Sequence, residues 1–179
     1  MSAISTKTND NGQIAFDLNF AGNILLEAGR YDDAAKKFKA QVDTTDKADV
    51  PAENKEAAHR NTLYDEARIA IGKNDLATAK AKAKEYDKQV AVKQRPFEVR
   101  QAHELDGMVA MAAKDWKTAI AEFNKANQRD PRVIYLTALA YQGAGDAAKT
   151  KATAAKAADF NELALNLGFV RGKAKALTK

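Results

Sequence analysis

The residue types that most often carry catalysis or metal binding are sparse in this chain. There are two histidines, His59 and His103, which stand 44 residues apart, and there is no cysteine. The sequence after His103 lacks the second histidine of an H-E-x-x-H zinc motif, and the Gly-Ala-Gly run at 143–145 lacks the Gly-Lys-Ser/Thr of a phosphate-binding loop. Without cysteine there is no thiolate metal site or disulfide. We therefore expect a non-enzymatic protein with no catalytic residues, no metal site and no cofactor.

The composition instead favours an all-α protein. The 179 residues are enough for one domain with a sizeable core. Hydrophobic residues make up 45% of the chain but aromatic residues only 7%, because alanine dominates the apolar set. Alanine, lysine and glutamate are strong helix formers. Three prolines and nine glycines leave few helix breakers, so the helices can be long.

No segment has the pattern of a membrane span or a signal peptide. There is no run of about 18 apolar residues, and the polar start at residues 1–13 lacks the apolar region of a signal peptide. Residues 1–12 are expected to be flexible or disordered. The sequence leaves the compartment open: on its face we expect a cytoplasmic protein, and the alternative is an exported or periplasmic protein whose signal peptide has been removed.

The net charge of +5 is unevenly placed along the chain. Residues 1–131 hold 21 basic and 21 acidic side chains, whereas residues 132–179 hold 8 basic and 3 acidic ones. A basic segment can bind nucleic acid, but from Lys149 onward only Phe160 and Phe169 lie among these charges, and the rest of the chain offers no basic track. We therefore favour a solvated helix face, and consider nucleic acid an unlikely partner.

One spacing pattern recurs along the chain. A small residue is followed by a large apolar residue at nine positions, by Ala at twelve and by Phe or Ala at sixteen. Small residues let two helices cross closely, and Gly, Asn or Asp at each break mark a helix end and the next start. The pattern predicts antiparallel helical hairpins. The copies are Gly22, Tyr31, Ala34 and Phe38; Ala67, Leu76, Ala79 and Ala83; Gly107, Trp116, Ala119 and Phe123; and, more weakly, Ala138, Ala147, Thr150 and Ala154.

This pattern resembles the tetratricopeptide repeat (TPR), in the form found in bacterial proteins. The third copy has the family's A-x3-F at Ala119 and Phe123 and its closing proline at Pro131. The resemblance implies an all-α, right-handed α-solenoid of about four hairpins at 13–45, 52–92, 96–130 and 131–158. The spacing departs from the family period of about 34 residues, because the small residues are separated by 45, 40 and 31.

Local signals predict several helix boundaries. Pro51 and Pro96 mark helix starts, since proline is tolerated in a first turn. The stretch from Asp115 to Pro131 has the pattern of one amphipathic helix with a cap in front and a stop behind. Asn161 is expected to cap a last helix over 161–177, which would cover the apolar end of the final repeat.

The resemblance also implies a site. In the family, the first helix of each hairpin lines a groove that holds a peptide or protein segment, and helical spacing from the small residue gives the lining residues. Tyrosine and methionine would supply adaptable apolar area, and asparagine would bond a peptide backbone. We expect a protein-binding scaffold, with about half of the lining residues packing between repeats instead. The candidates are Asn19, Asn23, Tyr64, Arg68, Glu104, Met108, Met111, Tyr135 and Leu139.

Other kinds of partner were weighed against this one. Some family members clamp the C-terminal carboxylates of chaperones with Lys, Asn and Arg; only Asn23 matches that set and Glu104 would repel the ligand, so no such clamp is expected. Two alternatives stay open. One is binding of nucleic acid or an anionic surface through the basic C-terminal region. The other is self-assembly into a homo-oligomer through incompletely covered repeat ends.

Overall fold

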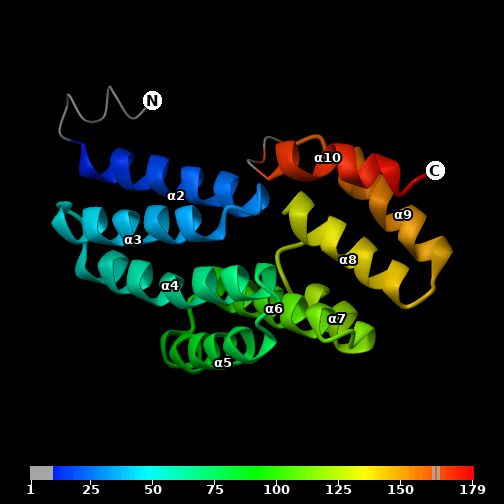
Figure 1. Ribbon diagram of the computed structural model, residues 1–179, viewed down its shortest axis with the longest axis horizontal. Coiled ribbons are helices and arrows are strands. Elements are labelled where there is room, and N and C mark those ends of the chain that lie inside the picture. Colours follow the sequence, from blue (N-terminus) through cyan, green and yellow to red (C-terminus); the bar gives the residue numbers. More distant parts are fainter. Residues whose placement is uncertain (1–9, 163, 165) are drawn as a thin grey trace. The chain divides into compact units, whose positions relative to one another are not determined.

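The computed structural model describes residues 10–162, 164 and 166–179, and its regular elements there are all α-helices (Figure 1). This confirms the all-α prediction. Of residues 1–12, which were expected to be flexible, residues 1–9 lie outside the described residues, and the first described helix already begins at Asn11. The helices are α2 (Asn11–Glu27), α3 (Tyr31–Lys47), α4 (Ala52–Gly72), α5 (Leu76–Lys93), α6 (Pro96–Ala112), α7 (Trp116–Phe123), α8 (Pro131–Gly143), α9 (Ala147–Ala158) and α10 (Leu167–Ala176).

The helices pack as neighbouring pairs within two compact units, residues 1–89 and 90–179. In the first unit α2 packs on α3 and α3 on α4, while α5 contacts α4 through Tyr64 and Tyr86, whose ring centroids are 6.0 Å apart. In the second unit α6, α7, α8 and α9 pack in chain order, and α10 lies on α8 and α9. Among the described helices, none is both long and apolar enough to cross a bilayer.

Each hairpin turns at the same point of the sequence pattern, seven and eight residues after its small residue. In the third hairpin the backbone N–H of Lys114 donates to the carbonyl of Met111 at 3.0 Å, and that of Asp115 to the carbonyl of Ala110 at 2.9 Å. This pair of bonds closes a helix around one residue in the left-handed conformation. The equivalent residues of the four turns are Gly29 (φ 74°), Asn74 (φ 61°), Lys114 (φ 61°) and Gly145 (φ 80°).

Three of these turns run directly into an aspartate that caps the next helix. The carboxylates of Asp75, Asp115 and Asp146 accept a hydrogen bond from the backbone N–H three residues on, at 3.0, 3.1 and 3.0 Å. Hydrogen bonds from Thr78, Thr118 and Lys149 hold the pKa of the three carboxyl groups below the ordinary value. The turn sequence therefore ends one helix and starts the next.

These caps predict that stability falls in acid. Because the folded-state pKa values lie below 3.8, the caps contribute fully above pH 3.8, and that contribution is lost as pH falls through the folded-state values. Urea unfolding from about pH 6 to about pH 2 measures this loss. Asp115→Asn should keep the cap, since Asn caps as well as Asp, yet lose less stability on acidification. The same acid response in both proteins would show that Asp115 contributes nothing to it.

The inward positions of the pattern are buried, as predicted. Ala34, Ala79 and Ala119 are all 0% exposed, and Thr150, which replaces alanine in the fourth hairpin, is 6% exposed. The hydroxyl of Thr150 donates to the carbonyl of Asp146 at 2.8 Å, so its polar atom is satisfied inside its own helix. The twelfth position therefore faces the partner helix in every hairpin.

The glycines of the pattern lie where an aromatic ring crosses the helix. A Cβ placed on Gly22 would lie 2.5 Å from Cε1 of Phe38, and one on Gly107 would lie 2.5 Å from Cδ1 of Phe123. Real Cβ atoms do not approach other carbons so closely. The residue sixteen positions later therefore uses the space that the missing side chain leaves.

A second set of glycines receives a ring from the preceding hairpin. A Cβ on Gly143 would lie 2.6 Å from Cε3 of Trp116, and one on Gly72 would overlap Cε1 of Tyr31. Tyr31 and Trp116 hold the large apolar position of the pattern. In each unit this residue therefore joins its own hairpin to the next one in the chain.

The helix expected from Asp115 towards Pro131 is shorter than its sequence pattern. α7 ends at Phe123, and residues 124–130 form turns and irregular chain. The amide of Gln128 donates to the carbonyls of Phe123, at 2.6 Å, and Ala126, at 3.2 Å. A side chain thus bonds carbonyls that a continuing helix would bond with its own backbone, while Ala126 remains buried at 4% exposure.

The last helix also starts later than predicted. α10 begins at Leu167 rather than after Asn161, and residues 163 and 165 of the expected helix lie outside the described residues. Asn166 precedes it and donates its amide to Asp130 Oδ2 at 2.7 Å. Arg171 donates to the carbonyls of Ala158 and Phe160 at 3.2 and 2.9 Å. The bonds of Arg171 hold the end of α9 against α10, and the bond of Asn166 ties the start of α10 to the N-cap of α8.

Candidate functional site

The candidate residues on α2 and α4 meet in one polar cluster, the Arg68 network, made of Asn19, Asn23, Tyr64, Asp65 and Arg68. Arg68 Nη1 donates to Asn23 Oδ1 at 2.9 Å and lies 3.5 Å from Asp65 Oδ1. Its guanidinium carbon is 5.2 Å from the centre of the Tyr64 ring. Asn23 Nδ2 in turn donates to Asn19 Oδ1 at 3.1 Å. Side chains of α2 and α4 thus meet in hydrogen bonds although each helix packs mainly on α3.

Most of the Arg68 network is closed to solvent. Tyr64, Asp65 and Arg68 are 3%, 3% and 5% exposed, and the Nε of Arg68 is buried without a hydrogen-bond partner among the described residues. Only Asn19 and Asn23 are half-buried. The expectation that Tyr64 and Arg68 face a groove is therefore not met, because these side chains cross between α2, α4 and α5 and pack the helices together.

The candidate residues of the second unit also serve the packing of the helices. Glu104 on α6 accepts a charged hydrogen bond from Arg132 on α8 at 2.5 Å, and both side chains are largely buried. Met108 and Met111 are partly buried against the core around Phe123. Tyr135 packs on Ala157, Ala158 and Ala174, and Leu139 is half-buried on α8.

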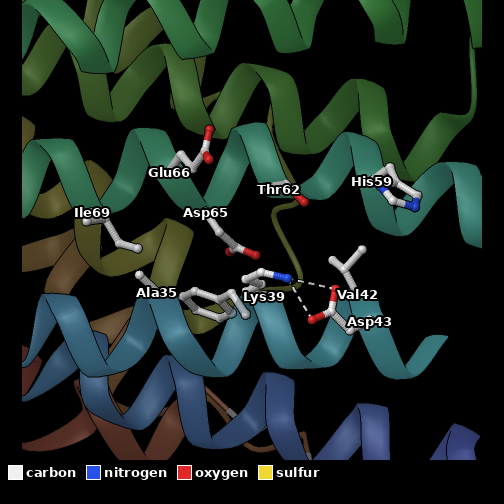
Figure 2. A pocket seen from close by; sticks show the side chains of 10 residues that line it. Ala35, Lys39, Val42, Asp43, His59, Thr62, Asp65, Glu66 and Ile69 are labelled. Atoms are coloured by element: carbon white, nitrogen blue, oxygen red, sulfur yellow. Dashed lines mark hydrogen bonds and ion pairs between the residues drawn. The ribbon is translucent and has the colours of Figure 1, made fainter. Parts of the chain in front are cut away.

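The first unit contains a pocket of about 440 Å³ between α3 and α4, which we call the α3–α4 pocket (Figure 2). Phe38, Val42 and Ile69 supply apolar surface, and Ala35 contributes only a methyl group. Polar and charged side chains complete the lining. The full set is Ala35, Phe38, Lys39, Val42, Asp43, His59, Thr62, Asp65, Glu66 and Ile69.

The carboxylates around this pocket are each paired with a basic side chain. Three carboxylates, Asp43, Asp65 and Glu66, face one lysine and one histidine. Lys39 Nζ donates to Asp43 at 2.7 Å, as the dashed lines in Figure 2 show. Glu66 is bonded to Lys82 of α5 at 2.8 Å, and this hydrogen bond raises the pKa of Lys82. Exposed ion pairs such as these contribute little free energy to stability. A cationic ligand can therefore replace a lysine beside Asp43 or Glu66 at a small cost in free energy.

Sequence reasoning missed the pocket because half of its lining comes from the second helix of a hairpin. A groove of the family type is lined by first helices, so α3 was treated as packing surface. Asp65 belongs both to the α3–α4 pocket and to the Arg68 network. Its carboxylate lines the pocket and accepts hydrogen bonds from Asn61, at 3.0 Å, and from Arg68. The one local sign that we find in the sequence is a small residue, Ala35, one turn before Lys39.

Several basic residues of the C-terminal region make contacts within the fold. Arg132 pairs with Glu104. Lys149 Nζ lies 2.9 Å from Asp146 Oδ2, and Lys151 Nζ donates to the backbone carbonyl of Lys179 at 2.8 Å. Together with the bonds of Arg171 described above, these contacts account for four of the eight basic side chains in this region.

Comparisons with protein-family models, with curated proteins and with solved structures give no match. Function is therefore inferred from the geometry of the chain itself.

Proposed function

We propose that this protein is a non-enzymatic scaffold of TPR-like repeats, arranged as a right-handed solenoid of about four hairpins, that binds a protein or peptide segment. Three features support the repeat interpretation: the recurring turn geometry, the buried alanine position and the glycine–ring contacts. Repeats of this kind stack into extended surfaces suited to holding another chain.

The observation that carries the proposal is the α3–α4 pocket. Ligand sites are concave, mostly apolar and equipped with a few polar groups, with volumes of roughly 300–1,000 Å³. The pocket's volume of about 440 Å³ lies in that range. Its apolar side chains, Phe38, Val42 and Ile69, suit the aliphatic stem of a long side chain, and Asp43 and Glu66 suit a positive head group. The proposed partner therefore presents lysine or arginine on an extended or helical segment.

The test compares two peptides that differ only in charge. A labelled peptide of alternating leucine and lysine should bind the wild-type chain in a fluorescence-anisotropy titration, and its leucine–glutamate counterpart should not. Ala35→Phe would fill the pocket without changing its charge, and should weaken binding about tenfold or more, or about 1.4 kcal/mol. The matched control is Ala77→Phe, at an exposed alanine on α5 outside the pocket.

A charge-neutralising pair separates the pocket from general attraction to an acidic surface. Glu66→Gln removes a pocket carboxylate, whereas Glu162→Gln removes an exposed, ion-paired carboxylate of the other unit. Only the first should weaken the basic peptide's binding. If Ala35→Phe and Glu66→Gln leave binding intact while Asn23→Ala or Met108→Ala weakens it, the first-helix groove is the site and the pocket is not.

A further inference from the structure

A cluster of potential metal ligands lies in the second unit, where α6 and α7 pack together, and the proposed function does not use it. His103, Asp106 and Glu122 each offer one ligand atom, and these atoms lie within 4.8 Å of one another. All three residues are half-buried. His103 Nδ1 is already 2.8 Å from Glu122 Oε2, so the two side chains point at each other from different helices.

We propose that His103, Asp106 and Glu122 form a binding site for a divalent transition-metal ion, with Zn²⁺ as the best match. One imidazole and two carboxylates are a donor set that zinc accepts, whereas magnesium and calcium prefer oxygen ligands alone. His103 and Asp106 are three residues apart, which places them on one face of α6. Three protein ligands leave a fourth position for water or for a group from a partner.

The distances allow the site to form with small side-chain movements. Zinc binds these ligands at roughly 2.0–2.2 Å, so tetrahedral ligand atoms lie about 3.4 Å from one another. The longest separation in the cluster is within 4.8 Å, and rotation of a carboxylate about its side-chain bonds covers such a difference. The ion would take the place of the hydrogen between His103 and Glu122.

The two oxygens of Glu122 face different partners. Lys125 Nζ donates to Oε1 at 2.8 Å, while Oε2 faces His103. Burial pushes the pKa of Glu122 up, but hydrogen bonds from Lys125 and His103 outweigh it, and the pKa lies below the ordinary value. Lys125 thus orients an ionised carboxylate, yet its own charge repels a cation. Removing that charge should tighten metal binding, which is an effect that loss of a purely structural contact would not produce.

The other histidine supplies a matched control. His59 Nε2 lies 3.0 and 3.1 Å from the two oxygens of Asp46, so it also has a carboxylate partner. Among the described residues, however, His59 belongs to no group of three potential ligands. A histidine beside one carboxylate is expected to bind zinc weakly, so His59→Gln should leave the affinity unchanged.

The experiment is a calorimetric titration of the full chain with zinc chloride after treatment with a chelator, repeated with cobalt, whose visible absorption reports its coordination. We expect one saturable site. His103→Gln and Glu122→Gln should each weaken binding by about tenfold or more, His59→Gln should not change it, and Lys125→Gln should strengthen it. Circular dichroism checks that each variant is folded, and Asp106→Asn replaces any that is not.

Two outcomes would overturn the metal site. One is the absence of saturable binding of either metal by the wild-type chain. The other is equal affinity in His103→Gln and His59→Gln, which would mean that zinc binds through scattered surface groups. Neither outcome affects the peptide-binding proposal, because the α3–α4 pocket and this cluster share no residue.

Discussion

Replacing Gly107 by valine is expected to destabilise the protein by about 3 kcal/mol, the upper end of the usual cost of overpacking a core. The first added carbon would lie 2.5 Å from Cδ1 of Phe123, and that ring is 0% exposed, so it cannot move into solvent. The helices α6 and α7 must then separate or the ring must leave its rotamer. Urea unfolding followed by circular dichroism gives the change in unfolding free energy.

The control for Gly107→Val is a glycine with open space around it. A Cβ on Gly172, inside α10, would meet nothing within 4 Å, so Gly172→Ala should stabilise the helix by about 0.5–1 kcal/mol through its better helix propensity. If Gly107→Val proved as stable as the wild type, α6 and α7 could not cross as closely as described. The explanation that Gly22 and Gly107 make room for an aromatic ring would then be contradicted.

Arg68→Ala is expected to cost about 3–5 kcal/mol, the usual effect of removing one partner from a buried ion pair. Asp65, at 3% exposure, would lose the guanidinium of Arg68, and Asn23 Oδ1 would lose the hydrogen bond from Arg68. The measurement is again urea unfolding. Lys73→Ala is the control, because it breaks an exposed ion pair with Asp32, and exposed pairs contribute little.

A double-mutant cycle shows whether the cost of Arg68→Ala comes from the charge of Asp65. In the Arg68→Ala background, Asp65→Asn removes a buried negative charge that Arg68 no longer balances, so it should recover part of the stability. In the wild-type background the same change should destabilise. Additive effects of the two substitutions would mean that Arg68 stabilises the unit through Tyr64 and Asn23 and not through the ion pair.

The hairpins could be predicted from the sequence because their contacts repeat at fixed spacing. Gly107, Ala119 and Phe123 are placed relative to one another by the helical period and a short turn, and the structure buries each of them as expected. The hairpin turns could be predicted only in part from the sequence. Gly29 and Asn74 are residue types that adopt a positive φ readily, but Lys114 is not, and its conformation is imposed by the surrounding hairpin.

The site was harder to predict, because spacing along a helix gives the face of a residue and not what covers that face. Arg68 and Tyr64 were predicted to line a groove with Asn23, yet Tyr86 of α5 packs on Tyr64, and Tyr64 and Arg68 are buried. The α3–α4 pocket depends on the space left between Ala35 and Ile69, which are 34 residues apart in the chain. Such a gap follows from tertiary packing, and no local pattern encodes it.

The most direct test of a peptide-binding scaffold is to map the bound segment by amide chemical shifts. The ¹⁵N-labelled chain is titrated with the leucine–lysine peptide, and the shifts are followed residue by residue. We predict the largest changes around the α3–α4 pocket, at Phe38 to Asp43 and at Thr62 to Ile69, with little change in α9 and α10. Saturable shifts confined to the basic C-terminal helices, or no shifts at any concentration, would contradict the account.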